Sequence, residues 1–133
     1  MTARALIVDD DKDFLETLAK RMQKRGIKVS TAEPATVAMI LLEKESYDAV
    51  LIDLMMPEMG GIEALQIIRK KFPEIKVFII SGHPSIARRV AALKLPASDF
   101  IPKPIDFDYL MEMVKKVKRQ DDPEGKNEKQ GAG

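Results

Sequence analysis

Short apolar runs alternate along this chain with longer stretches of helical period, and this alternation constrains the fold more than any other feature. The apolar runs occupy residues 5–8, 27–30, 49–52, 77–80 and 100–101. The first, third and fourth contain no charged residue, as expected for inner strands of a parallel sheet whose two faces are both covered. The pattern therefore predicts an α/β fold in which a parallel five-stranded sheet lies between layers of helices.

The stretches between these runs carry apolar residues at the spacing of one helix face. In the first helix, we expect Gly26 to adopt a left-handed conformation and end the helix. In the second, we expect Val37, Ile40 and Leu41 to face the core. A fourth helix is expected over residues 85–95. The other stripes expected to face the core are Phe14, Leu15, Leu18, Ala19 and Met22; Ile62, Leu65, Ile68 and Phe72; and Phe107, Leu110, Met111, Val114 and Val117.

Composition limits the class of protein. Lysine and arginine total 22 against 21 acidic residues, so no overall field favours nucleic acid or a membrane surface. No cysteine is present, and no apolar run approaches the roughly 18 residues that a membrane span needs. We expect a cytoplasmic protein with one folded domain over residues 1–118. The polar segment 119–133 is expected to be a disordered tail or a linker.

Reactive side chains follow four of the predicted strands. Asp9 and Asp10 follow the first strand, Asp53 the third, Ser81 the fourth and Lys103 the fifth. Parallel strands share one direction, so these side chains are expected along a single edge of the sheet, where such folds bind ligands. Asp11 and Asp13, which come next in the chain, are interpreted as acidic residues favoured by the dipole of the first helix.

This combination of groups favours phosphoryl chemistry. Clustered carboxylates repel one another unless a cation is present, and Mg²⁺ is commonly held by one or two carboxylates together with water and phosphate oxygens. A lysine adds a second positive charge, and a serine hydroxyl adds a hydrogen-bond donor. A carboxylate at Asp53 with these neighbours is suited to accept a phosphoryl group as an acyl phosphate.

Four segments, "LIVDDD", "DLMMPEMGG", "IISGH" and "DFIPKP", together resemble the receiver domain of response regulators in two-component signalling, the CheY-like family. The resemblance covers about residues 3–118. It implies a flavodoxin-like (βα)5 three-layer sandwich with strand order 2-1-3-4-5. It also implies that Asp53 is the phosphoacceptor, that Asp9, Asp10, Asp53 and the backbone carbonyl of Met55 hold Mg²⁺, and that Lys103 pairs with the acceptor and then with the phosphoryl group.

The resemblance also implies how the signal would be read. Ser81 matches the switch hydroxyl and Phe100 the aromatic switch of the family, whereas Met55 and His83 stand at positions that tune dephosphorylation. The implied phosphodonor is a histidine kinase or a histidine phosphotransfer protein. Phosphorylation is expected to change a surface built from the fourth helix, the fifth strand and the fifth helix. That surface would meet a downstream target, a covalently linked output domain or a second copy, and no direct binding of nucleic acid or membrane is expected.

The chain departs from the family pattern near the site. Gly60 replaces a usual aspartate, Pro96 replaces a usual glycine before the fifth strand, and Pro102 removes an amide beside the lysine. The bond between Lys103 and Pro104 matches a position that is cis in the family. These departures concern the rigidity of loops and of the signalling surface, and they leave the expected chemistry in place.

Two other functions for this edge of the sheet do not fit the sequence. A phosphatase of the haloacid dehalogenase type needs a second aspartate two residues after the nucleophile, where this chain has Met55. A flavin binder of similar fold would want a Ser/Thr/Gly-rich phosphate loop after the first strand, where this chain has acids. A receiver-like interaction domain that is not phosphorylated and a receiver excised from a longer regulator or hybrid kinase stay open. No enzymatic activity is expected beyond assistance to its own phosphorylation and dephosphorylation.

Overall fold

The computed structural model of the protein describes residues 3–33, 35–53, 61–81 and 99–121. Five strands form one parallel sheet in the order β2-β1-β3-β4-β5. The strands are β1 (Arg4–Val8), β2 (Lys28–Ala32), β3 (Ala49–Asp53), β4 (Lys76–Ser81) and β5 (Asp99–Pro102). The helices are α1 (Lys12–Lys24), α2 (Ala35–Lys44), α3 (Gly61–Lys71) and α5 (Phe107–Asp121).

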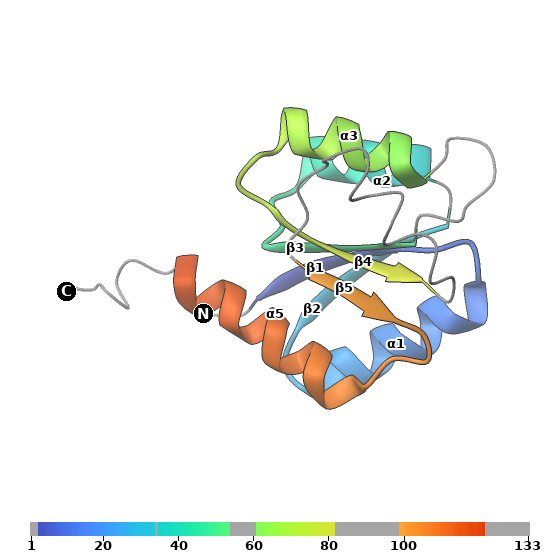
Figure 1. Ribbon diagram of the computed structural model, residues 1–133, viewed down its shortest axis with the longest axis vertical. Coiled ribbons are helices and arrows are strands. Elements are labelled where there is room, and N and C mark those ends of the chain that lie inside the picture. The colour runs from blue at the N-terminus through green and yellow to red at the C-terminus, as the bar shows by residue number, and fades with distance from the viewer. Residues whose placement is uncertain (1–2, 34, 54–60, 82–98, 122–133) are drawn as a thin grey trace, which may run out of the picture.

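Figure 1 shows three layers, with α2 and α3 on one face of the sheet and α1 and α5 on the other. Both faces are covered because the inner strands carry apolar side chains on both sides of the sheet, and these must be buried. All five residues of β3 are buried, as are four of the five in β1 and five of the six in β4. The predicted fold class, sheet direction and strand order are confirmed.

Successive residues of each inner strand contribute to two separate apolar clusters, because side chains alternate across a strand. Leu6, Val50 and Ile79 join the cluster beneath α2 and α3. Ile7 and Leu51 join the cluster beneath α1 and α5. The sheet is therefore held from both sides, and the carboxyl ends of its strands are fixed relative to one another.

The ends of α1 are set by local chemistry. The Asp11 side chain caps its first turn by accepting a hydrogen bond from the Phe14 backbone N–H at 3.1 Å. At the other end Gly26 has φ of 87°, the left-handed conformation predicted for it. The Gly26 N–H donates to the Gln23 carbonyl at 3.0 Å, and the Ile27 N–H donates to the Met22 carbonyl at 3.1 Å. These two bonds form a Schellman motif and satisfy carbonyls that the helix leaves unpaired.

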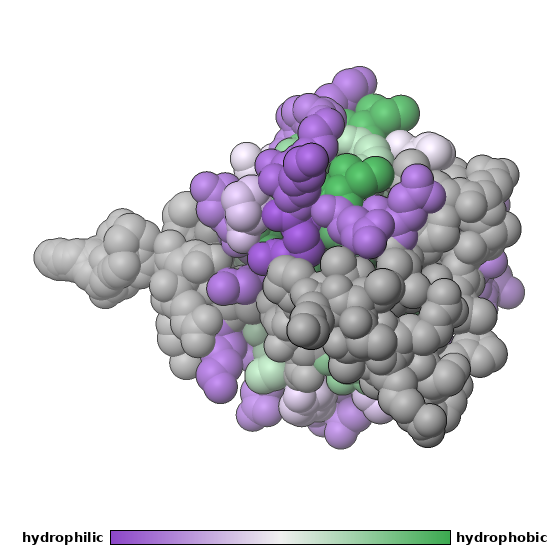
Figure 2. Space-filling view, turned by 45° about the horizontal axis from the view of Figure 1, so that its top comes forward, coloured by the Kyte–Doolittle hydropathy of each residue, from purple (hydrophilic) through white to green (hydrophobic). Residues whose placement is uncertain are grey.

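The predicted inner face of α2 is wrong at Val37 and Ile40 and right at Leu41, which packs against the core. Val37 and Ile40 are 38% and 54% exposed, whereas Ala38 and Leu42 are buried and Leu41 is half-buried against the core. This helix is apolar on almost every side, so its sequence does not single out one face, and the true face is displaced by one residue from the predicted one. Figure 2, which looks toward the side of α2 and α3, shows apolar residues exposed among hydrophilic ones.

The stripes of α3 and α5 agree with the prediction, as does that of α1 apart from Phe14, which is half-buried. Leu65 and Ile68 of α3 are buried, and Phe72 packs half-buried against the same cluster. The α5 stripe is buried from Phe107 to Val114. The helix expected over residues 85–95 and the tail from residue 122 lie outside the described residues, as do the side chains of Ile62 and Val117. Among the described residues, no helix combines the length and the apolar composition that crossing a bilayer requires.

Candidate functional site

Four of the predicted site residues meet at the carboxyl edge of the sheet. Asp9 directly follows β1, Asp53 ends β3, Ser81 ends β4 and Lys103 directly follows β5. The arrowheads of β4 and β5 in Figure 1 point to this edge. In the sheet register Asp53 lies opposite Ile80, and Ser81 lies opposite Pro102, so the strand ends are level. The side chains are brought together by topology, although half the chain separates them in sequence.

Asp9 is fully buried, with 0% of its side chain exposed, and its two carboxylate oxygens have different partners. Oδ1 accepts a hydrogen bond from the Asp11 backbone N–H at 2.9 Å, and Oδ2 accepts one from Lys103 Nζ at 2.8 Å. The Asp9 backbone N–H donates to the Ala32 carbonyl at 3.2 Å, which ties this loop to β2. A buried carboxylate is costly unless such partners stabilise its charge, so Asp9 is fixed in position.

Lys103 bridges the two buried carboxylates. Its Nζ lies 2.8 Å from Asp9 Oδ2 and 3.2 Å from Asp53 Oδ2, and its side chain is 23% exposed. The Lys103 backbone N–H donates to the Ser81 carbonyl at 2.9 Å, so the residue is anchored to the end of β4. The peptide bond from Lys103 to Pro104 is cis, as the family resemblance implied. The ammonium group therefore lies directly beside the carboxylate proposed to accept phosphate.

The charges at this edge shift two pKa values. The pKa of the Asp10 carboxyl is raised by partial desolvation and by the negative charges of Asp9 and Asp53. For Lys103, burial lowers the pKa, but hydrogen bonds and charge attraction from Asp9 and Asp53 outweigh burial and raise it above its ordinary value. Lys103 is therefore held in its charged form, whereas the surroundings of Asp10 disfavour its ionised form.

Three carboxylates are close enough to hold one cation. One oxygen from each of Asp9, Asp10 and Asp53 lies within 4.8 Å of the others. Asp9 and Asp53 are buried, whereas Asp10 is exposed and faces the surface. An all-oxygen set open on one side fits Mg²⁺, which keeps several water molecules when proteins bind it. The donor chemistry thus agrees with the predicted metal, and the Met55 carbonyl expected to complete the set lies outside the described residues.

Of the two predicted switch residues, Ser81 is 1% exposed at the end of β4 and Phe100 is half-buried in β5. Phe100 packs against the cluster beneath α2 and α3. His83 and the departures at Gly60 and Pro96 lie outside the described residues. The structure thus brings Asp9, Asp10, Asp53, Ser81 and Lys103 to one edge of the sheet. Phe100 lies in β5 opposite Ile79, two residues before Ser81 in the register.

One contact was not predicted. The ring of Phe14 lies under the Lys103 ammonium, with Nζ 4.2 Å from the ring centroid. The sequence assigns Phe14 to the core stripe of the first helix, whereas the structure leaves it half-buried at the rim of the site. Its place at the start of the helix that follows the acidic residues is the one sequence signal for such a role, and that signal does not reveal which cation it meets.

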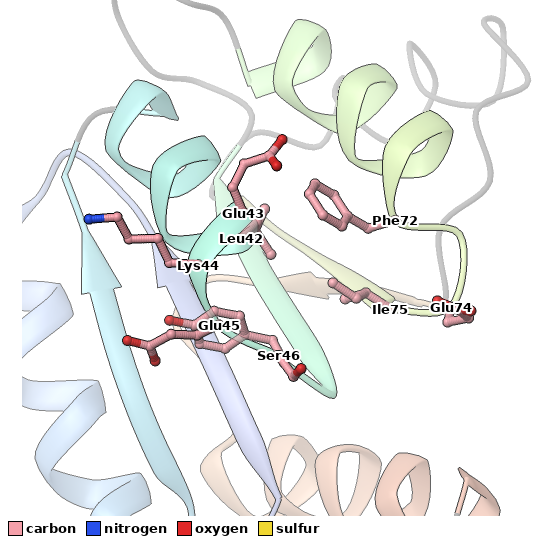
Figure 3. A pocket seen from close by; sticks show the side chains of 9 residues that line it. Leu42, Glu43, Lys44, Glu45, Ser46, Phe72, Glu74 and Ile75 are labelled. Carbon is pink, nitrogen blue, oxygen red and sulfur yellow. The ribbon is translucent and has the colours of Figure 1, made fainter.

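A hollow of about 360 Å³ lies between the C-terminal ends of α2 and α3. Figure 3 shows Leu42, Phe72 and Ile75 on its apolar side and Glu43, Glu45 and Glu74 at its edges. Glu43 pairs with Lys71 at 2.8 Å, and both side chains are more than half exposed. None of the predicted site residues lines this hollow, so the acidic edge is the better candidate for the function.

Comparison with known proteins identifies the family. The model of the response regulator receiver domain matches residues 5–115, which is most of the chain. The chain belongs to the response regulator receiver family. Receiver domains of this family are signalling domains of two-component systems, so the acidic edge of the sheet lies in a protein of phosphorylation-based signalling.

Among curated proteins, the photosynthetic apparatus regulatory protein RegA of Rhodobacter capsulatus is 35% identical over 101 residues, 76% of this chain and 55% of that protein. The response regulator MprA of a Mycobacterium species is 30% identical over 124 residues, 93% of this chain and 54% of that protein. The receiver chain thus spans about half the length of the curated relatives that it matches.

Solved structures agree with the family and the fold. A CheY-like receiver domain protein from Methanospirillum hungatei superposes with a TM-score of 0.82 at 30% identity, covering 90% of this chain and 97% of that one. The response regulator TrrA of Thermotoga maritima, solved in complex with Mg²⁺ and BeF, superposes with a TM-score of 0.79 at 30% identity, covering 87% of this chain and 99% of that one. The receiver fold is therefore shared along nearly the whole of these domains.

Proposed function

We propose that this receiver is a phosphorylatable switch in which Asp53 accepts a phosphoryl group from a phosphohistidine of a histidine kinase or a phosphotransfer protein. The proposal rests on one observation above all. The buried Asp53 carboxylate is 3.2 Å from the Lys103 ammonium and has oxygens of Asp9 and Asp10 within 4.8 Å. Two kinds of positive charge, a lysine and a divalent cation, can therefore act on one nucleophile.

In the proposed reaction, a carboxylate oxygen of Asp53 attacks the phosphorus atom of the phosphohistidine. A P–O bond forms while the P–N bond breaks, and the electron pair of that bond returns to the imidazole nitrogen. Lys103 stays paired with the phosphoryl oxygens, since its anchored backbone keeps the ammonium at this edge. Phosphoryl transfer needs positioning and charge stabilisation more than covalent chemistry from the protein, and these residues would supply both.

Mg²⁺ is the proposed cofactor. Asp9, Asp10 and Asp53 would hold it together with the backbone carbonyl of Met55, and the bound cation would neutralise the charge that develops on the phosphoryl oxygens. Because Asp9 is already held by Lys103 and the Asp11 N–H, its oxygens are preorganised. Desolvation and the negative charges of Asp9 and Asp53 raise the pKa of Asp10, so a bound cation would favour its ionised form.

We further propose that the phosphorylated state is read through Ser81 and Phe100. The Ser81 hydroxyl would move to the phosphoryl oxygens, and Phe100 would turn into the space that this frees, which would change the surface formed by residues 85–95, β5 and α5. Met55 and His83 would tune the lifetime of the acyl phosphate. The surface would then meet a downstream protein, a linked output domain or a second copy of the chain.

A non-phosphorylated receiver-like interaction domain is the alternative. The meeting of Asp53 with Lys103 and two further acids speaks against it, because that arrangement costs electrostatic repulsion that a passive domain does not require. The chain spans about half the length of its curated relatives, and the proposed switch would work in the same way in an isolated receiver or within a longer regulator or hybrid kinase.

Treatment with a small phosphodonor such as acetyl phosphate and Mg²⁺, read by intact mass, tests the function. We expect the wild type to gain one phosphoryl group, and Asp53→Asn to gain none. A matched control is Asp48→Asn, which changes an aspartate outside the site that accepts from the Arg4 N–H at 2.8 Å. Equal phosphorylation of wild type and Asp53→Asn would overturn the assignment of the acceptor.

A further inference from the structure

The aromatic ring of Phe14, on α1, contacts the Lys103 ammonium. Lys103 Nζ lies 4.2 Å from the ring centroid, and the same atom lies 2.8 Å from Asp9 Oδ2 and 3.2 Å from Asp53 Oδ2. We infer that Phe14 is a positioning residue for phosphorylation, which holds the Lys103 ammonium over the phosphoacceptor by a cation–π contact. This inference rests on the proposed role of Asp53.

Phe14 is itself held in place by the acidic loop. Its backbone N–H donates to Asp11 Oδ1 at 3.1 Å, and the Asp11 N–H donates to Asp9 Oδ1 at 2.9 Å. The second oxygen of Asp9 accepts from Lys103, whose ammonium covers the Phe14 ring. The contacts therefore form a closed circuit through four residues, in which the ring and the ammonium are located by the same carboxylate.

The chemistry of lysine explains why a ring is useful here. A lysine side chain is a flexible stem that carries a point charge with three N–H donors, and it loses much rotational freedom when held in one place. Two short contacts direct the Lys103 ammonium toward Asp9 and Asp53. The face of an aromatic ring attracts a cation without competing for the carboxylates, so Phe14 adds a third contact to those of Asp9 and Asp53.

A hollow beside this contact is large enough for the Lys103 ammonium to move into. This hollow of about 290 Å³ opens between α1 and the segment that follows β5, and both Phe14 and Lys103 line it. A smaller aliphatic side chain at position 14 would enlarge the hollow and expose the ammonium to water. The lysine would then spend less time at the distance at which it stabilises a phosphoryl oxygen.

Simple packing is the competing explanation, since Phe14 also contacts the cluster beneath α1 and α5. Aromatic and aliphatic replacements separate the two. Phe14→Leu keeps an apolar side chain and loses the ring face, whereas Phe14→Tyr keeps the ring face. Phe72→Leu is a matched control, because Phe72 is another half-buried phenylalanine that lines the distant hollow of Figure 3.

The first measurement is spectroscopic and uses no phosphodonor. With lysine labelled at the ε-methylene, the ring current of Phe14 should shift the Lys103 proton signals upfield in the wild type. We expect Phe14→Leu to lose this shift, and Phe14→Tyr and Phe72→Leu to keep it. Lys103→Met assigns the signal. The shift tests the contact even if Asp53 proves not to be the acceptor, so failure of the inference and of the proposed function are distinguishable.

The second measurement is the rate of phosphorylation by acetyl phosphate with saturating Mg²⁺. We expect Phe14→Leu to lower this rate roughly three- to tenfold, the effect of losing one cation–π contact in a partly desolvated site. Phe14→Tyr should restore it, and Phe72→Leu should leave it unchanged. An unchanged rate in a folded Phe14→Leu, or an equal loss in Phe14→Leu and Phe14→Tyr, would overturn the inference. If Phe14→Leu does not fold, Phe14→Met replaces it in both measurements.

Discussion

Lys103 Nζ lies 2.8 Å from Asp9 Oδ2, although the two residues are 94 positions apart in the chain. The pair forms because β1 and β5 are parallel members of one sheet, which brings the residues that follow them to the same edge. Asp9 is fully buried, so water cannot readily replace Lys103 as the partner of its Oδ2.

Replacing Lys103 with methionine is expected to destabilise the protein strongly. The change leaves the buried Asp9 carboxylate without its cation, which costs on the order of 3 kcal/mol of unfolding free energy. Lys71→Met is the matched control, because the Lys71 pair with Glu43 has the same 2.8 Å distance but is more than half exposed. We expect that variant to lose at most about 1 kcal/mol. Urea unfolding measures both, and equal losses would contradict the assigned role of burial.

Stability is expected to fall at alkaline pH through Lys103. Its pKa is raised in the folded protein above the ordinary value of 10.5, so the folded state binds the proton more tightly than the unfolded state. This contribution is complete below the unfolded pKa and is lost as pH rises through the folded pKa. Urea unfolding from about pH 9 to about pH 12 should show a decrease that is smaller in Lys103→Met. The same decrease in both proteins would assign it to other groups.

Replacing Asp10 with asparagine is expected to stabilise the metal-free protein while abolishing its response to Mg²⁺. The pKa of Asp10 is raised in the folded protein above the ordinary value of 3.8. The stability that this proton contributes is therefore complete below pH 3.8 and is lost as pH rises through the folded pKa. At neutral pH the ionised group is therefore unfavourable, and its removal should raise Tm by a small amount, on the order of 1–3 °C because the residue is exposed.

Both effects can be measured by thermal unfolding, first in the presence of a chelator and then with added Mg²⁺. Binding to the folded state alone raises the wild-type Tm with Mg²⁺ concentration by mass action, and Asp10→Asn should show little or no rise. A lower Tm for Asp10→Asn in chelator would contradict the repulsion, and a full Mg²⁺ response in that variant would remove Asp10 from the cation site.

The orientation of α2 can be tested by two truncations on one helix. Leu42 is 4% exposed and Ile40 is 54% exposed. Leu42→Ala should cost about 2–4 kcal/mol of unfolding free energy because it empties core volume, whereas Ile40→Ala should cost less than about 1 kcal/mol. The reverse order in urea unfolding would restore the face that the sequence pattern favours.

The sequence predicts elements whose pattern is unambiguous. Residues 5–8 of β1, 49–52 of β3 and 77–80 of β4 are all apolar, so the inner place of these strands in a parallel sheet follows directly. The face of α2 is wrong for the opposite reason, since a helix that is apolar on nearly all sides has no single favoured stripe. Its orientation depends on which side chains fit the sheet, and that is decided by tertiary packing.

For the site, residue types and strand ends predict the meeting of Asp9, Asp53 and Lys103, because topology alone brings strand ends together. The sequence does not show which of the acidic residues is buried and which pairs with Lys103. It treats Asp9 and Asp10 alike, yet one is buried and paired with Lys103 while the other is exposed. It also misses Phe14, whose contact with Lys103 depends on the path of the chain after β5.

The central claim is that Asp53 accepts the phosphoryl group, and chemical identification of the phosphorylated residue tests it most directly. After treatment with acetyl phosphate and Mg²⁺, reduction by borohydride converts an aspartyl phosphate into homoserine, and peptide mass spectrometry locates the converted residue. We predict conversion at Asp53 alone, dependent on Mg²⁺ and absent from Asp53→Asn. Phosphate that resists reduction, or conversion at Asp9 or Asp10 in the wild type, would contradict the role of Asp53 as the acceptor.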